Sequence, residues 1–222
     1  MLEKSHPKPN IIFILPDQQR ADFLSCYDAN FIRTPHIDRL AERGILFSQA
    51  YSPHPLCVPA RVSLMTGMNA IKTGVLDNGK FLRPDYVERG IRLWPEILRE
   101  NGYYTAAIGK MHFYPWDLNL GFQYRVIAED KRWITIRDDY YHYLKTHGYR
   151  KLHGKEYPGY DGNKGAVYSQ IPWEHTVDRF VAEEACRFIQ QFGNDGPFAM
   201  MIGFPGPHCP YDPVERFARK FD

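Results

Sequence analysis

The chain has 222 residues, of which 44% are hydrophobic, 24% charged and 15% aromatic. This composition is typical of a soluble globular protein that can bury a sizeable core. A formal net charge of +2 is too small to indicate a nucleic acid or an anionic membrane as a partner. The stretch Met1 to Asn10 is polar, and the apolar run after it is too short for an export signal or a membrane span, so we expect a cytoplasmic protein.

The first predicted element is a strand at residues 10–15, a short apolar run rich in β-branched residues. Such a run suits a strand that is buried on both faces of a parallel sheet. Its carboxyl end presents Asp17 and Gln18, at the position where open α/β sheets bind their ligands.

Helices and strands alternate along most of the remaining chain. Thr34 and Pro35 predict the start of a helix and Gly44 its end. The other predicted elements are a strand at 45–51, a helix at 59–67 with Cys57 near its N-terminus, a helix at 95–100, a strand at 103–108, a helix at 177–192 and a strand at 197–204. This alternation predicts an α/β fold with a mostly parallel central sheet flanked by helices.

The segment 113–176 differs from the rest of the chain, because it holds nine of the fifteen tyrosines and three of the four tryptophans. Long insertions of this kind are usually functional loops or subunit contacts. An ordinary aromatic packing layer is an equally weighted explanation, since aromatic residues dominate both cores and interfaces.

The four cysteines are far apart and have no C-x-x-C spacing: Cys26, Cys57, Cys186 and Cys209. A chain of this length does not need disulfides, which are rare in cytosolic proteins. We therefore expect four free thiols.

Four groups of residues at strand ends or helix starts could carry chemistry: Asp17 with Gln18, Cys57 with Arg61, Lys110 with His112, and His208. Each group alone has a structural explanation. An aspartate after a strand is often a turn residue, and a lone cysteine is often buried and inert. Lys110 and His112 suit a solvated turn, and His208 suits a rigid proline-rich loop.

Together, these groups indicate a site that cleaves an anionic ester. Asp17 and Gln18 offer oxygen ligands for a divalent cation. Cys57 at a helix start would meet backbone N–H groups and the positive end of the helix dipole, and Arg61 would point back toward that end. Lys110 would add a positive charge, and the histidines His112 and His208 would add groups that exchange protons near neutral pH.

The motif Cys57-x-Pro59-x-Arg61 resembles the sulfatase signature, in which the cysteine is oxidised to formylglycine by a dedicated maturase. Other segments resemble the same family in order and spacing, from residue 9 to about 213. They are Pro9 to Asp17, Thr34 to Ala41 with Gly44, Leu64 to Gly67, Leu98 to Tyr103, Gly109-Lys110-Met111-His112, and Pro207-His208-x-Pro210-Tyr211.

The resemblance implies an alkaline phosphatase-like fold, a sulfate-ester substrate and a role for each site residue. Asp17, Gln18 and the formylglycine made from Cys57 would bind a divalent cation, Ca²⁺ in the first place and Mn²⁺ or Mg²⁺ as alternatives. Arg61 would hold the hydrated aldehyde, and Lys110 would bridge it and the substrate. The resemblance makes His112 the base of the second step, and His208 the residue that contacts the sulfate or protonates the leaving alcohol.

Three departures from the family pattern affect this interpretation. The usual Asp-Asp pair is Asp17-Gln18 here, which is more similar to choline-sulfatase and phosphonate monoester hydrolase relatives. Ala60 stands where the signature commonly has serine. Finally, family members are about twice as long, so residues 1–222 would form the N-terminal part of the catalytic domain and lack a second metal pair.

Three functions therefore remain in view. The leading one is sulfate-ester hydrolysis, and the second is hydrolysis of phosphonate monoesters or phosphodiesters at the same site. The third is a catalytically incomplete fragment that acts as a binding or assembly module, and we expect little turnover from the 222-residue chain alone. The aromatic segment at 113–176 and the missing half both suggest exposed apolar surface, which would favour a partner such as a second copy in a homo-oligomer.

Overall fold

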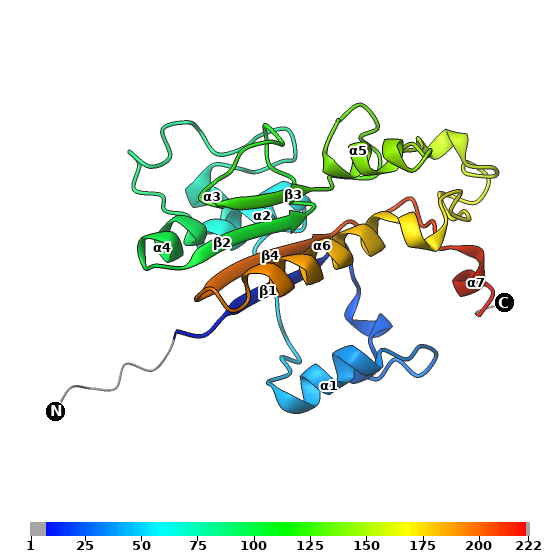
Figure 1. Cartoon of the computed structure of the whole chain (residues 1–222), viewed down its shortest axis with the longest axis horizontal. Coiled ribbons are helices and arrows are strands. Elements are labelled where there is room, and N and C mark those ends of the chain that lie inside the picture. Colours follow the sequence, from blue (N-terminus) through cyan, green and yellow to red (C-terminus); the bar gives the residue numbers. More distant parts are fainter. Residues whose placement is uncertain (1–7, 221–222) are drawn as a thin grey trace.

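A four-stranded, fully parallel sheet forms the centre of the molecule in the computed structural model, which describes residues 8–220 (Figure 1). The polar stretch at 1–10, on which the expectation of no export signal depends, thus lies mostly outside the described residues. The strands are β1 (Ile11–Pro16), β2 (Tyr104–Gly109), β3 (Tyr124–Ile127) and β4 (Phe198–Phe204), in the spatial order β1-β4-β2-β3. The predicted α/β class with a parallel sheet is confirmed.

Helices connect these strands and cover both faces of the sheet. In chain order they are α1 (Pro35–Arg43), α2 (Cys57–Thr66), α3 (Ala70–Thr73), α4 (Trp94–Glu100), α5 (Asp139–Thr146), α6 (Val177–Phe192) and α7 (Glu215–Ala218). Short 3₁₀ turns add η1 (Ala21–Phe23), η2 (Ser25–Tyr27), η3 (Gly154–Glu156) and η4 (Trp173–His175). Within residues 8–220, no helix combines the length and apolar character that crossing a membrane requires.

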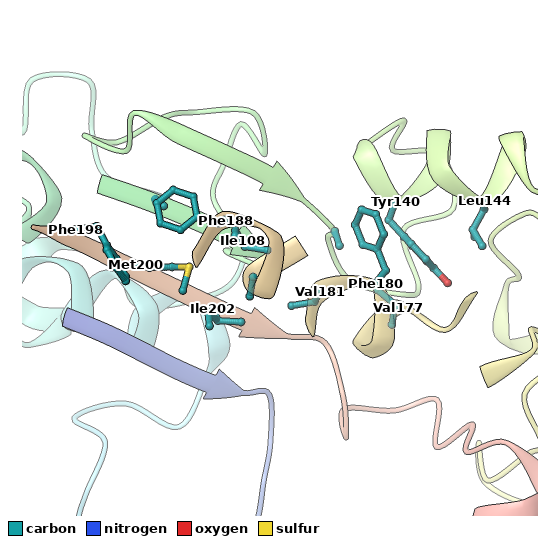
Figure 2. Close-up of a cluster of buried hydrophobic side chains, with 13 residues drawn as sticks. Ile108, Tyr140, Leu144, Val177, Phe180, Val181, Phe188, Phe198, Met200 and Ile202 are labelled. Carbon is teal, nitrogen blue, oxygen red and sulfur yellow. The ribbon is translucent and has the colours of Figure 1, made fainter. Parts of the chain in front are cut away.

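The larger core lies between α6 and one face of the sheet (Figure 2). Val181 and Phe188 of α6 are fully buried there, against Ile108 of β2 and Met200 of β4. Their spacing along α6 is helical, which is why the sequence pattern located this helix correctly. Tyr140 of α5 joins the same cluster and extends it beyond the sheet.

A second core covers the opposite face. Because successive strand residues point to opposite sides, Ala107 and Met201 pack here, although Ile108 and Met200 face α6. Met65 of α2 packs against them. The two cores hold α2 and the strand ends in a fixed relation, and the candidate site is built on those elements.

The first strand is less buried than the sequence predicted. β1 lies at the edge of the sheet, so its residues alternate between a covered and an open face, and Ile12 and Ile14 are 44% and 53% exposed. The expectation of burial on both faces is therefore wrong: Ile12 and Ile14 lie on the same face as Met200 and Ile202, but the core under α6 does not extend to β1.

The predicted strand at 45–51 is also wrong. This segment follows α1 as irregular chain, on the side of β1 away from the sheet (Figure 1), and Phe47 is 66% exposed. A strand needs a neighbour to satisfy its backbone groups, and this segment pairs with none of the four strands. Its apolar residues therefore do not produce a strand.

The aromatic segment at 113–176 contributes to packing, which is one of the two explanations considered for it. Tyr140 and Leu144 are part of the larger core, which is the packing role. The same segment contributes β3, an edge strand that the sequence did not predict, and the chain that leaves β3 reaches the candidate site.

Candidate active site

An open cleft of about 910 Å³ lies at the carboxyl edge of the sheet, beside the start of α2. It brings together five of the predicted site residues: Asp17, Gln18, Cys57, Arg61 and His208. Parallel strands end at the same edge, so residues far apart in the sequence meet there. The other two predicted residues, Lys110 and His112, are buried and do not line the cleft.

Two glycines allow the ends of β2 and β4 to approach closely behind the cleft. A Cβ atom on Gly109, whose φ is +91°, would lie 2.1 Å from the carbonyl oxygen of Gly203. A Cβ atom on Gly203 would in turn lie 2.0 Å from the carbonyl oxygen of Lys110. Side chains at either position would push the strands apart, so these glycines position Lys110.

Lys110 is the centre of a buried chain of ion pairs (the buried ion chain), and it is not a charge on the cleft wall. Only 1% of its surface is exposed, and its Nζ lies 2.6 Å from Asp17 Oδ2 and 2.7 Å from Asp130 Oδ2. Two carboxylates on one ammonium satisfy the charge that burial would otherwise penalise. Lys110 therefore acts on the cleft through Asp17.

Arg61, which belongs to α2, also joins this buried ion chain. Its Nη1 donates to the carbonyl oxygen of Lys110 at 2.7 Å, and its Nη2 lies 3.5 Å from Asp17 Oδ2. Burial alone would raise the pKa of Asp17, but Lys110 and Arg61 outweigh it and hold the pKa below its usual value. Asp17 is therefore ionised at neutral pH.

Cys57 is the first residue of α2, as the sequence predicted to within two residues. The expected set of free backbone donors beside it is not there, however. The N–H of Val58 donates to Asn78 Oδ1 at 3.0 Å, Pro59 has no N–H, and the N–H of Ala60 donates to the carbonyl oxygen of Leu56 at 3.0 Å. Stabilisation of an anion at Cys57 therefore depends on Arg61 more than on the helix backbone.

Two acidic residues that the sequence did not single out follow β3 and support the site. Glu129 is fully buried, and its carboxylate accepts the N–H groups of Met111 and His112 at 3.1–3.2 Å. Asp130 holds Lys110 on one side and Arg132 on the other. Their signal in the sequence is an apolar run that ends in an acidic pair, the same pattern that identified Asp17.

His112 is held in a left-handed conformation with φ of 59°, is 4% exposed, and lies edge-on to the ring of Trp133. Burial, together with the charges of Lys110 and Arg61, lowers its pKa to about 4. The imidazole is therefore neutral at pH 7. The expectation that it titrates near neutral pH is corrected.

Because of this low pKa, we expect the free energy of unfolding to fall in mildly acidic solution. An unfolded chain protonates His112 near its usual pKa of 6.5, whereas the folded chain does not until about pH 4, so the unfolded state binds more protons between these values. From pH 7.5 to pH 5 the wild-type chain should lose about 2 kcal/mol more unfolding free energy than His112→Gln. Urea denaturation of both chains at the two pH values measures this, and parallel losses would contradict a buried neutral imidazole.

His208 is half-buried at the opposite wall of the cleft, and its Nδ1 lies 2.7 Å from the carbonyl oxygen of Cys209. Because a carbonyl only accepts, Nδ1 carries the hydrogen, and Nε2 is the nitrogen left for proton exchange. This geometry suits contact with a bound anion or a leaving group. All four cysteines, including Cys209, have free thiols.

The described residues do not complete a site for a divalent cation. Asp17 and Gln18 supply oxygens in the cleft, but Ca²⁺ takes about six to eight. No group of three histidine, cysteine, aspartate or glutamate side chains within residues 8–220 could hold a metal ion. The Asp17 carboxylate is instead neutralised by Lys110 and Arg61.

The fold and the cleft thus define an α/β protein with a cationic pocket at the carboxyl edge of a parallel sheet. A family model described as Sulfatase matches residues 9–222, and the chain belongs to the sulfatase family. The resemblance found in the sequence is confirmed.

Individual relatives cover nearly the whole chain. This chain is 31% identical to an arylsulfatase of Clostridium perfringens, across 93% of this chain and 44% of the relative. It is also 31% identical to a choline-sulfatase of Rhizobium meliloti, across 95% of this chain and 40% of the relative. The chain therefore spans less than half the length of these two curated relatives.

The fold matches solved structures as well. A phosphonate monoester hydrolase of Agrobacterium radiobacter superposes with a TM-score of 0.73 at 23% identity, across 97% of this chain and 44% of the other. This match shows that the two chains share a fold. A second structure, solved with its substrate D-glucosamine-2-N,6-O-disulfate, has a TM-score of 0.66 at 25% identity and covers 94% of this chain and 36% of the other.

Proposed function

We propose that this chain carries the nucleophile side of a sulfatase active site, which hydrolyses sulfate esters through a formylglycine made from Cys57. The observation that supports this most is the cleft itself: Cys57, Arg61 and His208 line one cavity in a chain of the sulfatase family. A sulfate ester is an anion. The ionisable side chains that line the cleft include two arginines, two histidines and one carboxylate that Lys110 neutralises: Arg61, Arg132, His54, His208 and Asp17.

The other residues of the cleft would support this reaction in separate ways. The hydrated aldehyde at position 57 would supply a hydroxyl able to attack sulfur and displace the alcohol oxygen. Arg61 would bind the negative charge that develops beside it, because its guanidinium is fixed by the carbonyl oxygen of Lys110. His208 would donate a proton to the leaving alcohol through Nε2. His112, which is neutral at pH 7 and lies behind the cleft wall, would be the base of the second step, in which the remaining hydroxyl loses its proton and sulfate is released.

A divalent cation is part of the proposal for the complete enzyme, with Ca²⁺ first and Mn²⁺ or Mg²⁺ as alternatives. Asp17 and Gln18 would contribute two of its oxygens. The remaining ligands are not found among residues 8–220, so we assign no step to a cation bound by this chain. Binding there would also require Asp17 to share its charge with Lys110.

The modification at Cys57 gives a direct test. We expect coexpression with a formylglycine-generating maturase to lower the intact mass by about 18 Da, which corresponds to a cysteine converted to an aldehyde. The variant Cys57→Ala, expressed in the same way, should show no change. An unmodified thiol in the presence of an active maturase, verified on a known substrate, would refute the proposed mechanism and favour a binding or assembly module.

The Asp17-Gln18 pair keeps a phosphonate or phosphodiester substrate as the second candidate. Both substrate classes carry a negative charge and would use the same cleft. The complete enzyme that contains this chain should be assayed on matched aryl sulfate and aryl phosphonate esters. A higher kcat/KM for the sulfate supports the first candidate, and the reverse order replaces it with the second.

A further inference from the structure

Arg132 is a cation on the cleft wall that has no part in the proposed mechanism. It belongs to the chain that follows β3, and it lines the same cavity as Cys57 and His208. Its side chain is 46% exposed, in contrast to Arg61, whose side chain is 7% exposed. Arg132 is therefore the more accessible of the two cleft arginines.

The orientation of this guanidinium is set by one buried carboxylate. Nε and Nη2 of Arg132 each donate to Asp130 at 2.8 Å, and the Arg132 backbone N–H donates to the same carboxylate at 3.0 Å. The Asp130 side chain is 2% exposed and is itself held by Lys110. Two donors are used in this fork, which leaves three of the five guanidinium N–H groups for another partner.

Three cations at the cleft, Arg61, Lys110 and Arg132, pair with two carboxylates, so this group of side chains carries a net positive charge. Arg61 and Lys110 both bind Asp17, so their charges are already committed at the base of the cleft. The hydrogen bond with Asp130 raises the pKa of Arg132, and the nearby sulfurs of Cys57 and Cys209 add to this rise. Arg132 is thus a permanent positive charge close to the reacting position.

We propose that Arg132 determines specificity by binding a second negatively charged group, carried by the leaving-group part of the substrate. This inference rests on the proposed function, because it assumes that the first anionic group binds beside Cys57. A guanidinium recognises a carboxylate or a second sulfate through paired hydrogen bonds, and the donors not used by Asp130 are available for that geometry. An exposed ion pair with a purely structural role would not distinguish singly from doubly charged ligands.

Binding of two sulfonates tests this without any turnover, because sulfonates are not hydrolysed as esters. Calorimetry on the 222-residue chain should give a Kd for 4-sulfobenzoate roughly tenfold lower than for benzenesulfonate, a typical gain for one added ion pair in a partly desolvated site. In Arg132→Gln the two Kd values should become equal, with the benzenesulfonate value unchanged. Arg132→Lys should restore part of the preference, since it keeps the charge and loses the fork.

A matched control comes from Arg83, which pairs with Asp85 through Nε at 2.9 Å, is 68% exposed and does not line the cleft. Arg83→Gln should keep the full preference and the wild-type unfolding temperature. Arg132→Gln removes one partner of the buried Asp130, so it should unfold at a lower temperature but stay folded where binding is measured, because Lys110 still holds Asp130. Equal Kd values for the two ligands in the wild-type chain overturn the inference and leave the proposed function standing. Binding of neither ligand overturns both, whereas a preserved preference with an unmodified Cys57 thiol refutes only the reaction.

Discussion

Replacing Lys110 by methionine is expected to lower the free energy of unfolding by about 3–5 kcal/mol. The ammonium lies between Asp17 and Asp130 at 2.6 and 2.7 Å, and all three side chains are almost fully buried. Methionine fills a similar volume but leaves both carboxylates short of a partner, and an uncompensated buried charge is costly. Urea denaturation of the wild-type and variant chains at pH 7 measures the difference.

Lys80→Met is the matched control for this prediction. Lys80 pairs with Asp77 at 3.4 Å, but its side chain is 67% exposed, so its loss should cost less than about 1 kcal/mol. A loss for Lys110→Met as small as that of the control would show that the buried ion chain does not stabilise the fold. Lys151 offers an independent comparison, because it forms a similarly buried pair with Asp138 at 2.7 Å.

The sequence predicted most of the elements that carry the cleft. Apolar runs and end signals located β1, β2, β4, α2 and α6 to within about two residues, the usual uncertainty of such boundaries. Asp17, Cys57 and His208 could be expected to meet because they follow or begin elements at one edge of a parallel sheet. Local sequence was sufficient to predict the position of a residue that lies at the end of its own helix or strand.

The sequence was insufficient where a position depends on a distant partner. β3 has only four residues with an arginine among them, so its pattern is too short to distinguish from a loop. The burial of Asp130 depends on Lys110, twenty residues away, and the burial of Lys110 depends on the close contact between two glycines. Such charges look solvent-exposed in the sequence, because charged residues are almost never buried without a partner.

These supporting residues divide the site into two layers. Cys57, Arg61 and His208 form the layer that lines the cleft and that a substrate would contact. Behind them, Lys110 and Glu129 set the position of the Asp17 carboxylate and of the His112 backbone. A substitution in the second layer should therefore disturb folding and the cleft together, whereas a substitution of Arg132, on the exposed wall, should act mainly on ligand choice, because Lys110 still holds Asp130.

Glu129→Ala should be the second most damaging single change, with an expected loss of about 3–4 kcal/mol in unfolding free energy. The carboxylate accepts the backbone N–H groups of Met111 and His112, and it is fully buried. Alanine leaves two buried donors without acceptors and an empty volume beside them. His112 would also lose the contact that holds its left-handed backbone, so its ring should leave the Trp133 edge.

Glu129→Gln separates the hydrogen bonds from the charge. Burial raises the pKa of Glu129, so the folded chain gains little from its ionised form, and Oε1 accepts both N–H groups while Oε2 shares that of His112. A glutamine oxygen in that place should therefore limit the loss to about 1 kcal/mol. Glu183→Ala, on the exposed side of α6, serves as the control for general effects of removing a carboxylate. If Glu129→Gln were as damaging as Glu129→Ala, the negative charge rather than the two hydrogen bonds would be what holds His112 in place.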